Sequence, residues 1–148
     1  MKFRFLEEIA TADVAFEAYG KSLDELFENC GLAVEETMVD TRTISKSNPP
    51  AGGQKAKIQI KNQNLENLLY DFLSELVFLK DRDGLLFSKT KVKINLVSNI
   101  YHLSSNLSGE AIDPSRHHLR ADVKAVTKHL FKTEKEKEGY KATVVLDI

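Results

Sequence analysis

Two aspartates and the last residue carry the oxygen atoms that give this sequence its clearest chemical signal. The final segment, Ala142–Ile148, is rich in β-branched and apolar residues and is predicted to form a buried strand. Asp147 interrupts this run, and the α-carboxylate of Ile148 lies one residue away. An anion in such surroundings loses several kcal/mol of solvation free energy unless a cation or hydrogen-bond donors compensate it. Oxygen ligands of this kind suit Ca²⁺ or Mg²⁺; the alternative is an edge strand that ends in water.

Asp13 is the second candidate ligand, near the other end of the chain. It stands between small residues and precedes an alternating run whose apolar members are Val14, Phe16 and Ala18. Small neighbours leave room for an ion. An Asp at such a place also commonly ends a turn and caps its backbone. By itself, Asp13 is compatible with either role.

Two amphipathic helices are predicted from the hydrophobic pattern. Ser22 and Glu25 have the spacing of a capping box, which places the start of the first helix at Ser22. The second is predicted to begin after Asn64 and to end at Asp81–Gly84. Cys30 lies on the apolar stripe of the first helix, so we expect it in the core rather than as a reactive thiol. The two stripes are Leu23, Leu26, Phe27, Cys30 and Val34, and Leu65, Leu68, Leu69, Phe72, Leu73, Leu76 and Val77.

Strands are predicted where apolar and polar residues alternate. These places are the N-terminus at Phe3 and Phe5, Lys57–Lys61, Val92–Leu96 and Ile100–Leu107. Ala121–Phe131 fits both the helical and the strand period, and we predict a strand there. Turn residues predict a loop over Thr41–Gln54, and alternating charges predict a solvated hairpin loop over Lys132–Gly139. Two main helices packed on a largely antiparallel β-sheet give an α+β fold, expected as a single domain over residues 1–148.

The composition limits the classes of function. With 42% hydrophobic and 29% charged residues, the 148-residue chain suits a globular domain with a real core. Its 21 basic and 22 acidic residues give a net charge of −1, so we expect no global positive field and only indirect contact with RNA, through a partner. The one cysteine, the lack of a signal peptide and the lack of a long apolar run predict a cytoplasmic protein with no membrane partner.

No motif in the sequence indicates a catalyst that acts alone. A P-loop, a dinucleotide-binding glycine motif, a zinc-protease motif and a serine-hydrolase elbow are all absent. The four histidines include the adjacent pair His117 and His118, which follow a turn-like sequence; their side chains would point in opposite directions, so we expect surface residues rather than two ligands of one ion. A metal-dependent hydrolase remains an alternative, but no base and nucleophile pair can be named for it.

Several ordered segments that cover nearly the whole chain resemble the archease family. They are Thr11–Val14, Ala18–Phe27, Leu68–Leu76, Gly109–Pro114 with His117, Val123–Thr127 and Val145–Ile148. The resemblance implies that Asp13, Asp147 and Ile148 hold a divalent cation. It also makes His117 and Lys124 possible partner contacts, although Lys124 would equally suit a solvent-facing strand. Ala10 stands where the family commonly has His before Thr-Ala-Asp, so a role for an imidazole at that place is in doubt.

The resemblance also implies an accessory function rather than an enzymatic one. Archeases look like cofactors of the GTP-dependent tRNA-splicing RNA ligase, promoting its guanylylation and multiple turnover. We therefore expect a metal-binding activator of that ligase in tRNA processing. The alternative is a chaperone or specificity modulator of a tRNA cytosine methyltransferase, with a structural metal and with the contact made by the Thr41–Gln54 region and an edge strand.

Overall fold

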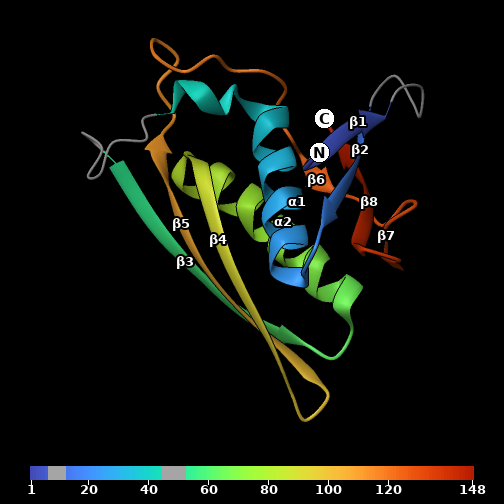
Figure 1. Ribbon diagram of the computed structural model, residues 1–148. Coiled ribbons are helices and arrows are strands. Elements are labelled where there is room, and N and C mark those ends of the chain that lie inside the picture. Colours follow the sequence, from blue (N-terminus) through green and yellow to red (C-terminus); the bar gives the residue numbers. More distant parts are fainter. Residues whose placement is uncertain (7–12, 45–52) are drawn as a thin grey trace.

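Two helices lie between two antiparallel sheets in the computed structural model, which describes residues 1–6, 13–44 and 53–148 (Figure 1). α1 (Leu23–Met38) packs against both β2 and β4, and α2 (Leu65–Asp83) packs against both β3 and β6. The predicted α+β class is confirmed, with two sheets in place of one. No helix in the described ranges is long and apolar enough to cross a membrane.

The first sheet joins the two ends of the chain. Its order is β1-β2-β8-β6, with β7 also paired to β8. The strands are β1 (Phe3–Leu6), β2 (Asp13–Gly20), β6 (Ala125–Val126), β7 (Lys132–Glu136) and β8 (Gly139–Asp147). All pairs are antiparallel. The first and last strands of the sequence therefore belong to one sheet.

The second sheet is formed by longer strands from the middle of the chain. Its order is β3-β5-β4, from β3 (Gly53–Asn62), β4 (Leu85–Val97) and β5 (Ile100–Ala111). A bulge at Ser88 interrupts the β4–β5 pairing, and Gly109 lies opposite it. A Cβ on Gly109 would lie 1.8 Å from the Leu86 carbonyl oxygen, so only glycine fits there.

The predicted helix ends are confirmed. The Ser22 hydroxyl accepts a hydrogen bond from the Glu25 amide at 3.2 Å, and the Asn64 side chain accepts one from the Asn67 amide at 2.9 Å. Gly84 ends α2 with a left-handed φ of 64°, a conformation that glycine adopts without strain. Cys30 is fully buried, as predicted, and burial raises the pKa of its thiol.

Two predictions for the C-terminal third are wrong in extent. Within Ala121–Phe131 only Ala125–Val126 is a strand, because the chain reaches the core at Val123 and Val126, three residues apart, and then turns. Lys132–Gly139 is not a loop: Lys132–Glu136 forms β7, and the turn is confined to residues 137–138. An exposed edge strand needs no apolar residues when cross-strand charges pair, as Glu134 and Lys141 do at 3.6 Å.

The Thr41–Gln54 segment is described only in part. Thr41–Thr43 forms a short 3₁₀ helix, η1, and β3 begins at Gly53. The predicted loop between them falls on residues 45–52, outside the described residues.

Carboxylates of α1 satisfy the free edge of β4. The amides of Ile94 and Val92 donate to Asp24 and Glu28, each at 2.9 Å. The Phe87 amide donates to Glu35 Oε1 at 2.7 Å. An edge strand with unpaired amides would invite association with another chain, so these bonds both close the sheet and fix α1 against it.

Of these three acidic residues of α1, Glu35 is the one whose burial is energetically unfavourable. It is fully buried, and its second oxygen, Oε2, has no hydrogen-bond partner in the described part of the chain. Burial raises the pKa of Glu35 to about 8, against the smaller opposing effects of the Phe87 amide and of Lys80. The side chain is therefore neutral in the folded protein at pH 7.

The stability of the protein should fall between about pH 4.5 and pH 8 because of Glu35. In this range the unfolded chain loses a proton that the folded chain keeps, which lowers the free energy of unfolding by a few kcal/mol. Glu35→Gln keeps an acceptor for the Phe87 amide and removes the titration. We expect it to unfold in urea close to wild type at pH 4.5 but at clearly higher urea at pH 8.

The matched control is Glu136→Gln, on the exposed strand β7. It should follow the wild-type pH profile. Equal stabilisation by Glu35→Gln at both pH values would contradict the assignment of a neutral, buried carboxyl.

Candidate functional site

Asp13 and Asp147 lie directly opposite each other in the β2–β8 pair. Side chains of directly opposed residues in an antiparallel pair point to the same face, with Cβ atoms ~5 Å apart. The strand register therefore brings together two carboxylates from the two ends of the sequence. This is the juxtaposition that a shared cation would require.

The pair points away from the helices. The neighbouring residues Val14 and Leu146 belong to the core or pack against it, as do Phe16 and Val144 further along the strands. Because side chains alternate along a strand, Asp13 and Asp147 lie on the outer face of the sheet, where both are half-buried.

The other side of Asp147 is lined by a small residue. Ala125 of β6 is its partner across the second strand pair, so the row of side chains runs Asp13, Asp147, Ala125. The Lys124 amide donates a hydrogen bond to the Asp147 carbonyl oxygen at 2.8 Å, and the Lys124 side chain is exposed. Ile148 is half-buried against the core. Ala125 leaves space beside the carboxylates, and Lys124 stands at the rim.

No cationic side chain of residues 1–6, 13–44 or 53–148 is paired with the two carboxylates. In the part of the chain that the structure describes, neither side chain has an ion-pair or hydrogen-bond partner. Like charges directly opposite each other on a sheet destabilise it. The charges of Asp13 and Asp147 are thus left for a ligand or for solvent.

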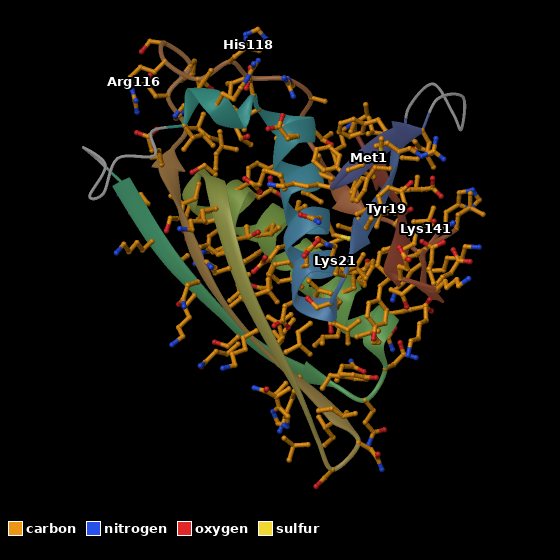
Figure 2. All side chains as sticks on the ribbon, in the orientation of Figure 1. Met1, Tyr19, Lys21, Arg116, His118 and Lys141 are labelled. Atoms are coloured by element: carbon orange, nitrogen blue, oxygen red, sulfur yellow. The ribbon has the colours of Figure 1, made fainter. Side chains whose placement is uncertain are left out.

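Glu17, on the same face of the sheet, differs from the two aspartates because it has ion-pair partners. Burial acts to raise the pKa of Glu17, but the hydrogen bond and charge of Arg4, at 2.5 Å, and the charge of Lys141, at 3.5 Å, outweigh it and lower that pKa. Tyr19 completes this group, and Figure 2 places Tyr19 and Lys141 on the same sheet. The half-buried Glu17 is therefore paired, whereas the two half-buried aspartates have no partner among the described residues.

The residues present fit a hard cation rather than a soft one. The described residues hold no group of three or more His, Cys, Asp or Glu side chains that could bind a metal. A cation between Asp13 and Asp147 would therefore take two side-chain carboxylates and complete its shell with main-chain oxygens, such as those of Ile148, and water. Oxygen-only sets of this kind are typical of Ca²⁺ and Mg²⁺.

His117 is a structural residue, contrary to the expectation of a surface histidine. Its side chain is fully buried after β5. Nδ1 accepts a hydrogen bond from the Asp113 amide at 3.0 Å, so Nε2 carries the proton and donates to Glu110 Oε1 at 3.1 Å. Arg116 also pairs with Glu110, at 2.6 Å. The imidazole holds the connection that follows the second sheet and does not join the aspartate pair.

The exposed residues of this connection are the ones available to a partner. Figure 2 shows Arg116 and His118 at one end of the molecule, with His118 exposed beside its buried neighbour. Opposite orientations of the two adjacent histidines agree with the sequence-based expectation. Ala10, Thr11 and Ala12 lie outside the described residues, so the place of the family's common His is not described.

Comparisons with known proteins agree with the fold and with the order of the motifs. The model of the Archease protein family matches residues 3–148. The protein archease of Methanothermobacter thermautotrophicus is 39% identical over 99% of this chain and 98% of its own length. That of Sulfurisphaera tokodaii is 40% identical over 99% of each chain.

Two solved structures share the architecture. The solution structure of a Methanobacterium thermoautotrophicum protein superimposes with a TM-score of 0.84 at 39% identity, covering 99% of each chain. A crystal structure from Thermotoga maritima, described as an archease and possible chaperone, has a TM-score of 0.58 at 22% identity, covering 94% of this chain and 93% of that one. The second supports the fold alone. On the family model and the curated relatives, the chain belongs to the archease family.

Proposed function

We propose that this chain binds a divalent cation through Asp13, Asp147 and the main-chain oxygens of Ile148. In this form it would activate the GTP-dependent tRNA-splicing RNA ligase. The observation that supports the cation is the cross-strand carboxylate pair, for which the described residues supply no ion-pair or hydrogen-bond partner. The ligase is proposed from the resemblance to archeases, and the cytoplasm is the proposed site of action.

The proposed role of the chain is to present the cation, not to catalyse a reaction. A bound Ca²⁺ or Mg²⁺ would neutralise the two carboxylates and hold the start of β2 to the end of β8. Divalent ions bridge phosphate oxygens during nucleotidyl transfer, which is the chemistry such a group would supply to the ligase. The half-buried position of both aspartates on an outer face leaves the site open to a partner.

A second candidate function is that of a chaperone or specificity modulator of a tRNA cytosine methyltransferase. It is favoured by the description of the Thermotoga maritima relative as a possible chaperone. In that case the cation would be structural, and its loss would weaken the fold rather than one partner's turnover. Substitution of one of the aspartates would therefore lower the turnover of the ligase under the first function and the stability of the fold under the second.

Cation binding should appear as a metal-dependent gain of thermal stability. At a cation concentration a hundredfold above the dissociation constant, the gain is about 2.7 kcal/mol, or several degrees in melting temperature. Asp13→Asn and Asp147→Asn should lose this gain. In chelator they should melt at or above the wild-type temperature, because each removes the repulsion of two facing anions.

Asp83→Asn, at the end of α2, is the matched control and should keep the metal response. Lower stability of the aspartate variants in chelator, or an unchanged response to Ca²⁺ and Mg²⁺, would contradict the site.

Ligase activation should depend on the same carboxylates. We expect Asp147→Asn to reduce the stimulation of multiple-turnover ligation by the cognate ligase by about tenfold or more, as loss of a metal ligand commonly does. Folding is checked by circular dichroism, and Asp83→Asn again serves as control. A folded Asp147→Asn that still stimulates fully would reject this mechanism, and absence of stimulation by wild type would favour the chaperone function.

Lys124 offers a test of partner contact separate from metal binding. Its amide, not its side chain, bonds to Asp147, so Lys124→Ala should leave the metal-dependent melting shift intact. If the exposed ammonium contacts the ligase, ligation should fall several-fold and the loss should shrink at high salt. An unchanged rate would identify Lys124 as a solvent-facing residue only.

A further inference from the structure

Six lysines line the outer face of the β3-β5-β4 sheet, on the opposite side from the helices. Ala56, Ile58 and Ile60 of β3 face the core, so the residues that alternate with them face solvent. The strand register extends the same division to β5 and β4. The exposed lysines are Lys55, Lys57 and Lys61 on β3 and Lys89, Lys91 and Lys93 on β4.

The lysines form two rows, one on β3 and one on β4, on either side of the polar central strand β5. We call these two rows the lysine rails. Asn106 of β5 lies between Lys57 and Lys91, and Ser108 lies between Lys55 and Lys89. The next rows across the sheet are Gln59, Ser104 and Lys93, and then Lys61, His102 and Asn95. Each row therefore carries at least one lysine beside a short or polar residue of β5.

No acidic side chain balances this face. Strands β3 and β4, and β5 as far as Gly109, contain no Asp or Glu. Among the described residues, none of the six lysines is in an ion pair. The net charge of −1 averages over a molecule whose charges are segregated, so it does not describe the potential at this face.

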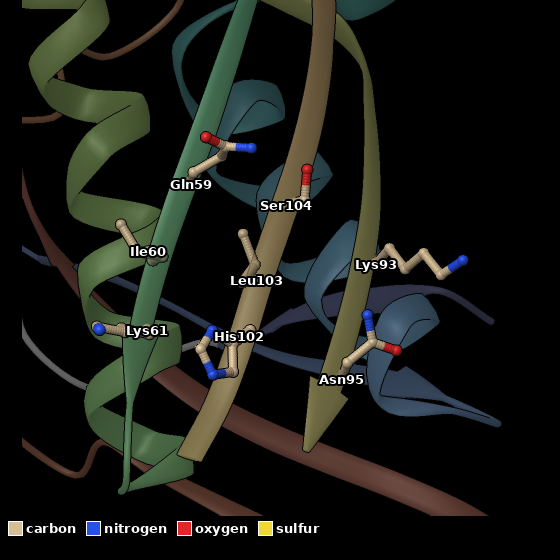
Figure 3. A pocket seen from close by; sticks show the side chains of 8 residues that line it. All are labelled: Gln59, Ile60, Lys61, Lys93, Asn95, His102, Leu103 and Ser104. Carbon is tan, nitrogen blue, oxygen red and sulfur yellow. The ribbon is translucent and has the colours of Figure 1, made fainter. Parts of the chain in front are cut away.

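The lower part of the face is hollowed. A depression of about 420 Å³ is lined by residues of all three strands, with Ser104 and His102 of β5 between Lys61 and Lys93 (Figure 3). In Figure 3 the two lysine side chains extend to opposite sides of the central strand. The short central residues thus leave a channel between the rails.

Protection of sheet edges does not account for the whole arrangement. Lysines on an edge strand discourage association with another chain, and this could explain those of β3. The edge of β4, however, is already closed by α1, whose Asp24 and Glu28 accept the amides of Ile94 and Val92. The lysines of β4 are therefore free for another role.

We propose that this face binds a single strand of nucleic acid through its phosphates. Lysines two residues apart on one rail are separated by ~6.6 Å, comparable with the separation of phosphates in an extended strand, and the rails lie about 10 Å apart. The rows of the channel hold hydroxyl and amide groups, the His102 imidazole and no Phe, Tyr or Trp, so binding is mainly through the backbone and independent of base sequence. The inference does not depend on the cation site, which lies on the other sheet.

An anionic membrane or an acidic protein is the competing occupant. On this sheet the exposed large apolar residues are Leu96 and Val97 of the β4–β5 hairpin, and Leu96 lies on the helix side of its strand. The lysine rails themselves carry no apolar anchor, which favours a soluble polyanion.

The test is fluorescence anisotropy with a labelled oligouridylate of about twelve nucleotides. Wild type should bind it with an affinity that falls steeply between about 50 and 200 mM salt, with a slope of about −0.7 for each phosphate contacted. Lys57→Gln/Lys91→Gln/Lys93→Gln should bind at least about tenfold more weakly, with a slope shallower by about two.

The control is Lys132→Gln/Lys135→Gln/Lys137→Gln on the β7–β8 hairpin, which removes the same charge from exposed positions. It should bind like wild type, and both variants should keep the wild-type melting temperature. An equal loss in both would mean non-specific charge attraction. Absence of RNA binding, or tighter binding of poly-glutamate or of phosphatidylserine vesicles at the same salt, would overturn the proposal in favour of those partners.

Discussion

The register of the β2–β8 pair decides which side chains of both strands enter the core and which face outward. It joins a strand near the start of the chain to the last strand, and it determines which residues face the core and which form the candidate site. Phe16 and Val144 face each other across this pair and are fully buried, while Asp13 faces Asp147 on the outer side. A slip of one residue would turn the aspartates into the core and the apolar residues into water, so packing alone fixes the carboxylates in place.

Contacts with α1 fix the position of the second sheet. α1 joins the two sheets because one of its faces packs on β2 while its carboxylates accept amides from the edge of β4. Among these, Glu35 is the member that burial keeps neutral, with one oxygen unpartnered. Since both helices lie between the sheets, neither outer face is covered by a helix.

Much of the secondary structure could be predicted from the sequence, because hydrophobic periodicity and helix capping depend on residues that are close together in the chain. The helices from Ser22 and Asn64 and the alternating strands follow from residues a few positions apart. Asp13 and Asp147 could be named from type and neighbourhood, yet their direct opposition follows from a long-range register that no local pattern contains. The lysine-rich face could not be predicted for the same reason. The lysines of β3 and β4 lie on one surface only because β5 lies between these two strands in the sheet. β7 was missed because its charges pair across strands, with Lys141 of β8.

The division of charge between the two outer faces bears on how such a protein would act. On the first sheet, Glu17 is paired with Arg4 and Lys141, whereas the two aspartates have no ion-pair partner among the described residues. On the second sheet the lysines have no ion-pair partner within the described ranges, and the helix layer lies between the two sheets. A cation held at Asp13 and Asp147 and a phosphate backbone held on the lysine rails would thus be on opposite sides of one chain and could not react with each other there. Under these two proposals, a second protein would receive the cation, the nucleic acid or both, which is consistent with the accessory function proposed above.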